Sequence, residues 1–169
     1  MAKSPKMLAD LFRDTLKDVY FAEKKIYATL PKMAKAARNE DLTAAFERHH
    51  VETEGQIKRL EDVFEEIGEK SQGKTCDAIM GILDEGAEIM DEYKGSPALD
   101  AGLLAAAQAV EHYEISRYGT LSAWAYELGY PKAVKLLEAT LDEEEATDEA
   151  LSALAEGVIN QEAEAEAVD

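Results

Sequence analysis

The sequence predicts an all-α protein, a four-helix bundle with an additional helix between its second and third bundle helices. Ala, Glu, Leu, Lys and Asp dominate the 169 residues, and aromatic residues make up only 7%, a composition typical of helical bundles. Apolar residues recur at helical spacing through four long segments, and Pro and Gly fall between these segments. No segment shows the alternation of polar and apolar residues that indicates a strand.

The first two long segments predict a helical hairpin. We expect one helix over about residues 7–37 and the next over about 42–67, with Asn39 and Asp41 supplying turn and cap chemistry between them. Pro31 lacks an amide proton, so it is expected to kink the first helix near its end.

A shorter segment and a second hairpin complete the chain. An amphipathic helix is expected over about 75–93, before the break at Gly95-Ser96-Pro97. Two further long helices are expected over about 98–128 and about 132–158, on either side of the stop signal Gly129-Tyr130-Pro131.

The middle segment determines the expected topology. As a helix of about 19 residues it would span ~28 Å, about the length of a bundle. Such a crossover lets the second hairpin start from the same end as the first, the single-crossover topology of ferritin-like four-helix bundles. The alternative is a five-helix bundle in which the middle segment is a full member. We expect a single domain over residues 1–169, with an acidic tail over about 160–169 that frays.

Net charge and cysteine content narrow the possible partners. A net charge of -18 repels nucleic acids and anionic lipids and attracts cations. The longest apolar stretch, residues 103–110, is far shorter than the ~20 residues of a membrane span. Cys76 is the single cysteine, so it is interpreted as a buried structural thiol, and the N-terminus lacks the features of a secretion signal. We therefore expect a cytoplasmic protein that binds neither nucleic acid nor membrane.

Acidic residues interrupt the apolar stripes of the long helices. Glu23 occupies a core position in the first helix, where a lone carboxylate would cost several kcal/mol. Glu111 and Glu114 interrupt the stripe of the third long helix. Glu144 interrupts that of the fourth, with Asp148 one turn further on. Counting from the two hairpin turns places these acids level with one another, so we expect them to meet.

The second long helix offers two candidate pairs. Glu47 and His50 match the Glu-x-x-His pattern of di-iron bundles, but that face of the helix is otherwise charged. His49 and Glu52 lie on the apolar stripe and supply the same two residue types at the same spacing. We favour His49 and Glu52 as the inward pair, with Glu47 and His50 as the alternative.

This inward set predicts a centre for two metal ions. Its carboxylates would repel one another strongly, whereas two bridged cations would neutralise them. Oxygen donors with few nitrogens suit iron, with manganese as the other candidate, and no cysteine pair indicates zinc. Glu52 and Glu144 are the expected bridges, and oxygen or peroxide activation is the usual use of such a site. The predicted metal ligands are Glu23, His49, Glu52, Glu111, Glu114 and Glu144.

Other interpretations of the same residues stay open. A buried Glu is commonly paired with Lys or Tyr, and a structural or interaction bundle with protonated core acids would need no metal. His112 is expected to pack at the flank of the site rather than bind metal, and Trp124 to lie in the core. Four tyrosines are expected to donate hydrogen bonds near the acids rather than to be oxidised. These are Tyr20, Tyr27, Tyr113 and Tyr118.

Four segments carry a family resemblance: DVYFAEKKI, AFERHHVETEGQIKRLE, AQAVEHYEISRYGTL and ELGYPKAVKLLEATLDEEEATD. Along almost its whole length the chain resembles the YciF/YciE family of bacterial ferritin-like proteins. The resemblance implies a ferritin-like bundle, a homodimer, a stress-response setting and a di-iron site. The fourth long helix lacks the inward Glu-x-x-His of ferritins and rubrerythrins. No Cys-x-x-Cys site is present to supply electrons, so an external electron donor would be needed.

Overall fold

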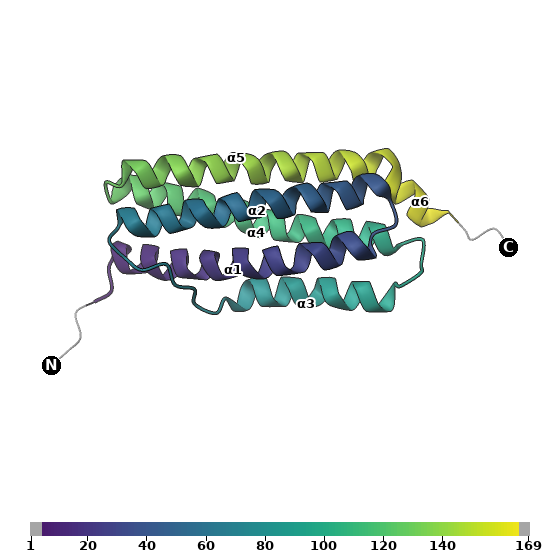
Figure 1. The fold of residues 1–169 in the computed structure, drawn as a ribbon, viewed down its shortest axis with the longest axis horizontal. Coiled ribbons are helices and arrows are strands. Elements are labelled where there is room, and N and C mark those ends of the chain that lie inside the picture. The colour runs from purple at the N-terminus through teal and green to yellow at the C-terminus, as the bar shows by residue number, and fades with distance from the viewer. Residues whose placement is uncertain (1–4, 166–169) are drawn as a thin grey trace.

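All regular structure in the protein is helical (Figure 1). The computed structural model describes residues 5–165 and contains no strand within that range. None of the helices in this part of the chain is long and apolar enough to cross a membrane. The five long helices begin and end within a few residues of their predicted bounds, which confirms the all-α class. The elements are α1 (Leu8–Ala36), α2 (Glu40–Glu66), α3 (Asp77–Glu92), α4 (Leu99–Glu127), α5 (Pro131–Leu154), the π-helix η1 (Ala155–Ile159) and α6 (Asn160–Glu164).

Four of these helices, α1, α2, α4 and α5, form a bundle, and α3 packs on the outside against α1 and α4 (Figure 1). α3 buries only Ile79 and Gly86, whereas each bundle helix buries a full stripe of side chains. Gly102 of α4 permits close approach of α3, because a Cβ at that position would lie 2.6 Å from Cγ2 of Ile89. α3 is therefore an additional helix on one side of the bundle and not a fifth full member.

The two hairpins turn at opposite ends of the bundle. The turn between α1 and α2 is bonded to the start of α4, because the amides of Arg38 and Asn39 donate to the Asp100 carboxylate at 2.9 and 2.7 Å. At the other end, the amide of Lys132 in α5 donates to Glu66 in the last turn of α2 at 3.1 Å. The expectation that the second hairpin starts from the same end as the first is therefore wrong. α3 carries the chain away from the end of α2, so α4 starts where the first hairpin turns (Figure 1).

Local signals in the sequence set the ends of the bundle helices. Asn39 caps α2, because its side-chain oxygen accepts hydrogen bonds from the amides of Asp41 and Leu42 at 3.0 and 3.2 Å. Between α4 and α5, Gly129 adopts a φ of 77°, which is favourable for glycine. Pro131 then occupies the first position of α5, where its missing amide proton does no harm.

The structure bears on two further expectations, for the helix around Pro31 and for the acidic tail. Pro31 lies inside α1, which nevertheless continues as a single helix from Leu8 to Ala36. Of the tail that was expected to fray, Asn160–Glu164 forms α6 after the π-helical turn η1. Residues 166–169 of that tail lie outside the described residues.

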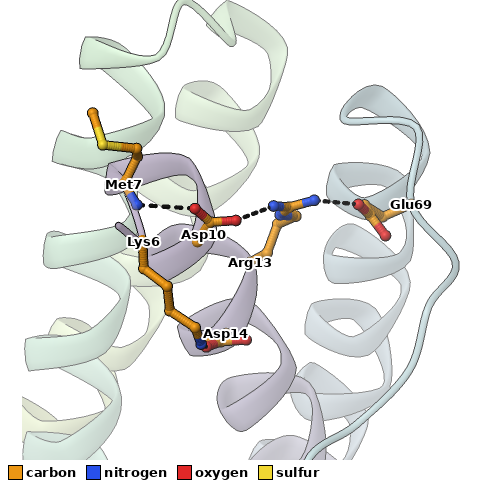
Figure 2. Close-up of polar contacts among 6 residues, drawn as sticks. All are labelled: Lys6, Met7, Asp10, Arg13, Asp14 and Glu69. Carbon is orange, nitrogen blue, oxygen red and sulfur yellow. Dashed lines mark hydrogen bonds and ion pairs between the residues drawn. The ribbon is translucent and has the colours of Figure 1, made fainter. Parts of the chain in front are cut away.

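Figure 2 shows how the start of α1 is tied to the loop that follows α2. Asp10 accepts a hydrogen bond from the Met7 amide at 2.9 Å and so caps the first turn. Arg13 pairs with Asp10 and also donates to Glu69 in the loop at 2.9 Å. Because these charged groups are still partly exposed to solvent, they fix local geometry more than they stabilise the fold.

The core consists of two apolar clusters separated by a polar layer. One cluster lies toward the turn between α1 and α2, and α1 contributes Ile26 and Leu30 to it. The other lies toward the turn between α4 and α5, and α1 contributes Phe12 and Leu16 to it. Trp124 is half-buried against this second cluster, and Cys76 is buried in the first, as expected of a structural thiol. The polar layer between the clusters contains Glu23, His49, Glu111, Glu114 and Glu144.

Replacing Asp100 with Ala is expected to destabilise the fold by about 1–3 kcal/mol, because two backbone amides would lose their acceptor. Asp91→Ala, at an exposed position of α3, is the control and is expected to change stability by less than about 0.5 kcal/mol. Urea denaturation measures both variants. Equal unfolding midpoints would show that Asp100 does not hold the two hairpins together.

Candidate metal centre

Five buried polar side chains converge in the layer between the apolar clusters, and all four bundle helices contribute. His49 Nδ1 lies 3.0 Å from Glu111 Oε1, and His49 Nε2 lies 3.6 Å from Glu144 Oε2. One ligand atom from each of His49, Glu111, Glu114 and Glu144 lies within 4.8 Å of the others. The fifth residue, Glu23, is fully buried beside them. The apolar stripes predict this inward orientation for all five residues.

Most polar atoms of this layer have no hydrogen-bond partner. Both carboxylate oxygens of Glu114 and Glu144 are buried without a hydrogen-bond partner, as are Glu23 Oε2, Glu111 Oε2 and His49 Nε2, whereas Glu111 Oε1 faces His49 Nδ1 at 3.0 Å. Within residues 5–165, no Lys or Arg forms an ion pair with these four carboxylates. Unpaired buried polar atoms are rare, and an unpaired buried charge costs several kcal/mol. The donor atoms therefore fit cations, which would both neutralise the charge and satisfy the oxygens.

Of the four tyrosines expected near the acids, Tyr118 alone donates a hydrogen bond to one of the five. It is buried on α4, and its hydroxyl donates to Glu23 Oε1. This bond occupies one oxygen of Glu23 and leaves Oε2 for another partner. The other three pair elsewhere: Tyr20 donates to Glu61 at 2.8 Å, Tyr27 stacks on His50, and the Tyr113 hydroxyl lies 3.2 Å from Cys76 Sγ.

Glu52 does not join the buried cluster, which corrects the expected inward orientation. It is exposed and lines a groove between α2 and α5, whereas the next residue, Thr53, is fully buried. The Thr53 hydroxyl donates to the carbonyl of His49 at 2.7 Å, so it is satisfied within its own helix. Glu52 in that place would add another unpaired carboxylate. Burial raises the pKa of Glu111, and nearby acids, Glu52 among them, raise it further.

The other candidate ligands lie outside the layer. Glu47 is exposed and His50 is half-buried, with its ring 4.1 Å from that of Tyr27, so His49 is the inward histidine of α2. His112 is exposed, and its Nε2 lies 3.1 Å from Asp148 Oδ2. His112 and Asp148 therefore pair with each other near the surface between α4 and α5.

An ion pair that sequence reasoning missed lies beside the layer. Arg59 of α2 and Glu143 of α5 make two contacts, Nη1 to Oε2 at 2.7 Å and Nη2 to Oε1 at 2.5 Å. The buried amide of Gln56 also donates to Glu143 Oε2 at 3.2 Å. In the sequence, Glu143 lies off the apolar stripe of its helix. The available signal was its position at the border of the stripe, directly before Glu144, but the pairing depends on how α2 and α5 are aligned.

Burial raises the pKa of every carboxyl group in the layer. Removal from water raises the pKa of Glu23 to about 7, against the opposing effect of the Tyr118 hydrogen bond. Burial also raises the pKa of Glu111 to about 8. The pKa values of Glu114 and Glu144 lie well above the usual range for the same reason, and neighbouring carboxylates raise them further. The four groups therefore resist ionisation together unless positive charge is supplied.

Oxygen atoms of four carboxylates and a nitrogen atom of one imidazole form a donor set for hard or borderline cations. Iron and manganese prefer such ligands, whereas structural zinc sites use cysteine and histidine. Because the oxygens converge from different helices, they can surround a cation rather than contact it from one side. The residues of the layer therefore fit the predicted iron or manganese.

A family described as a domain of unknown function, DUF892, matches residues 7–164. The chain belongs to the DUF892 family. Protein YciF of Escherichia coli strain K12 is 46% identical to it over 160 residues, which cover 94% of this chain and 96% of YciF. This DUF892 protein thus shows the resemblance to YciF that its four sequence segments predict.

Solved structures extend the comparison of this DUF892 protein to its fold. The crystal structure of the E. coli stress protein YciF has a TM-score of 0.88 at 44% identity, covering 93% of this chain and 99% of that one. YcfI of Rhodopseudomonas palustris, suggested to be a structural protein, has a TM-score of 0.83 at 43% identity, covering 90% and 97%. A protein from Xanthomonas campestris, at 20% identity and a TM-score of 0.69, covers 91% and 94% and shares the fold alone.

The metal-free DUF892 protein is expected to lose stability as pH rises from about 4.5 to about 8. Below this interval the carboxyl groups are protonated in both the folded and the unfolded chain. Within it they ionise in the unfolded chain, while Glu23 and Glu111, with pKa values of about 7 and about 8, stay protonated in the fold. With its pKa raised from 4.5 to about 7, Glu23 alone should lower the free energy of unfolding by roughly 3 kcal/mol, at 1.4 kcal/mol per pKa unit, and Glu111 should lower it further.

Urea denaturation of chelator-treated protein at both ends of the interval measures this loss. Glu144→Gln removes one titrating group from the layer and should flatten the pH dependence, whereas Glu145→Gln, at an exposed neighbouring position, should leave it unchanged. Stability that stays constant or rises across the interval would contradict the prediction.

Proposed function

We propose that this protein is a di-iron or di-manganese protein with a ferritin-like arrangement of its four bundle helices. The observation that carries the proposal is the convergence of unpaired carboxylate oxygens from α1, α4 and α5 beside the imidazole of α2. Replacing such a layer with well-packed apolar residues is often neutral or stabilising, so stability alone does not explain its acids. Cation binding does explain them.

The path of the chain supports the ferritin-like part of the proposal. The loop after α2 and α3 together carry the chain along the bundle to the start of α4 (Figure 1), and a single long crossover also joins the two hairpins of ferritin-like folds. A crossover of this length makes the two hairpins start at opposite ends, so the corrected direction of the second hairpin agrees with the proposal. The hydrogen bonds from Arg38 and Asn39 to Asp100 join these hairpins directly. We accordingly propose that residues 1–169 form one domain.

In this proposal five residues of the layer hold the ions, and a sixth joins them from the groove. Glu23 would bind through Oε2, because Tyr118 holds its other oxygen. Glu52 would turn inward from the groove between α2 and α5, and it is proposed to bridge the ions together with Glu144. The proposed ligands are Glu23, His49, Glu52, Glu111, Glu114 and Glu144.

Bound iron or manganese would supply electron-transfer chemistry with oxygen or hydrogen peroxide as oxidant. The chain's own residues prepare the site for that chemistry. Their acidic charge attracts cations, and the carboxyl groups release protons when a cation binds. The apolar clusters on both sides of the layer keep water away from it.

The setting proposed for this chemistry is stress response, because the chain is similar to the stress protein YciF over nearly its whole length. We also propose a cytoplasmic homodimer that receives electrons from an external donor. Cys76 is the single cysteine of the sequence, so no cysteine pair within the chain can supply electrons.

A structural or interaction protein is the second candidate. The raised pKa values of the layer favour protonated carboxyl groups, which could persist without metal. The similar protein YcfI has been suggested to be structural. In this case chelator treatment would leave the melting temperature unchanged at neutral pH.

Protein produced with ample iron is expected to retain about two ions per chain, the content of a carboxylate-rich di-iron bundle. The double variant Glu23→Ala/Glu144→Ala should retain less than about one, because it removes ligands from both hairpins. Elemental analysis measures the content. The control Glu47→Ala/Glu145→Ala removes two exposed acids from neighbouring positions and should load like the wild type. Equal metal content in all three proteins would show that the metal does not bind in this layer.

Ferrous ion bound anaerobically to the protein is expected to be oxidised faster than free ferrous ion, because the buried carboxylates would stabilise the ferric state. We expect hydrogen peroxide to react faster than oxygen. Rapid mixing with each oxidant, followed by absorbance, gives both rates. If bound ferrous ion is oxidised no faster than free ferrous ion by either oxidant, the proposed reactivity is wrong and only the proposed metal binding remains.

A further inference from the structure

Gln56 of α2 is a buried amide with a hydrogen-bond partner at only one of its two ends. Its side chain has an exposed fraction of 0%. The amide nitrogen Nε2 donates to Glu143 Oε2 at 3.2 Å. The amide oxygen Oε1, by contrast, accepts no hydrogen bond from the described residues 5–165. Unpaired buried amide oxygens are rare, because they lose their hydrogen bonds to water without replacement. This oxygen is therefore free to bind another group.

An ion pair determines which end of the Gln56 amide faces which side. Glu143 contacts the Arg59 guanidinium twice, at 2.7 and 2.5 Å, so its carboxylate is held in the charged form and only accepts hydrogen bonds. The NH2 end of Gln56 must face this carboxylate, because two facing oxygens would repel each other. Oε1 is therefore held in the direction away from the pair of Arg59 and Glu143.

The contacts of α2 with α4 place Gln56 at the same height in the bundle as Glu23. The two helices run in the same direction, because both begin where the first hairpin turns. His49 of α2 faces Glu111 of α4 at 3.0 Å. About 10 Å further along, at seven residues on each helix, are Gln56 and Tyr118. Because Tyr118 donates to Glu23, all three side chains lie at one end of the polar layer.

The contacts between α1 and α2, which are antiparallel, give the same height independently. Tyr20 donates to Glu61 at 2.8 Å. Tyr27 stacks on His50, with ring centres 4.1 Å apart. Glu23 lies between these two tyrosines on α1, so interpolation between their partners places it opposite about position 56 of α2. Two separate sets of contacts therefore agree on where the buried amide lies.

The ligand atoms of the polar layer divide into two groups. Those of His49, Glu111, Glu114 and Glu144 lie within 4.8 Å of one another and suit one ion. Glu23 is not a member of that group, and its Oε2 is buried without a hydrogen-bond partner within residues 5–165. A second ion bound by Glu23 would lie toward the other end of the layer from the imidazole of His49. Such an ion needs further oxygen ligands at its own height.

We propose that Oε1 of Gln56 binds the metal ion on the Glu23 side of the layer. The inference rests on the proposed function, since it adds a ligand to that metal centre. Glutamine carbonyl oxygens are ligands for hard cations, and they add a donor without adding negative charge. Two divalent ions balance the four buried carboxylates, so an uncharged donor preserves that balance. The two ions then differ, because one has a nitrogen ligand and the other has oxygen ligands alone.

Titration with manganese(II), followed by the electron paramagnetic resonance of the free ion, counts bound ions without any reaction. The wild type is expected to bind about two ions per chain. Gln56→Leu should bind the second ion roughly tenfold more weakly or worse. Gln108→Leu is the matched control, because Nε2 of Gln108 also donates to an acid of α5, Asp148, at 3.1 Å, but lies outside the layer. It should bind both ions like the wild type.

The stability of metal-free Gln56→Leu distinguishes a ligand from a structural residue. Leucine removes an unpaired buried oxygen, and Glu143 keeps its two contacts with Arg59, so the urea midpoint should be no lower than that of the wild type. A structural role predicts a lower midpoint with unchanged manganese affinity. A crystal structure of the manganese-loaded wild type adds a test without any substitution, and it should show Gln56 Oε1 about 2.0–2.6 Å from an ion.

The outcomes separate this inference from the proposed function. If the wild type binds two manganese ions and Gln56→Leu binds both equally well, with Oε1 away from either ion in the crystal, Gln56 is not a ligand and the metal centre stands. A single ion beside His49 would also overturn the assignment of Gln56. If the wild type binds no ion, the proposed metal centre fails, and this ligand fails with it.

Discussion

The burial of four carboxyl groups without a cationic partner from the chain is the constraint on which the rest of the structure depends. Any other fold of this sequence that buried Glu111, Glu114 and Glu144 would meet the same cost of unpaired oxygens. The bundle tolerates that cost because two apolar clusters, one on each side, supply the hydrophobic stabilisation. Tyr118 reduces the cost by bonding one oxygen of Glu23. The layer thus lies between the two clusters that stabilise the bundle.

The same constraint explains the polar contacts at the border of the layer. Arg59 lies close enough to lend positive charge, but its guanidinium is paired with Glu143 in two contacts and also donates to Thr140. The positive charge of Arg59 is therefore already neutralised. The carboxyl groups of the layer therefore remain available to a mobile cation, which would displace their protons when it binds.

Helical periodicity made the interior of the site predictable from the sequence. Glu23 and Glu144 each replace an apolar residue in a regular stripe, so the helix period alone fixes their inward direction. The direction of Glu52 was harder to predict because it lies at the edge of its stripe, where a small rotation of the helix places Thr53 inside instead. The pairing of Arg59 with Glu143 depends on the relative position of two helices that are distant in sequence, and no local signal encodes it. Whether Glu52 joins the five residues of the layer as a ligand depends on how its side chain rotates, and the apolar stripe does not determine that rotation either.

The separation of the core into two apolar clusters and one polar layer has a consequence for how such a protein can change. The side chains of the apolar clusters, such as Phe12 and Leu30, are different residues from those of the proposed metal site, such as His49 and Glu144. A few substitutions in a single layer could therefore replace one reactivity with another, or remove it altogether, while the scaffold stayed intact. Conversion of the layer to leucine and isoleucine would join the two clusters into one continuous hydrophobic interior, and the resulting bundle would be inert but at least as stable. The fold and the proposed metal site of this protein can therefore be changed separately by mutation.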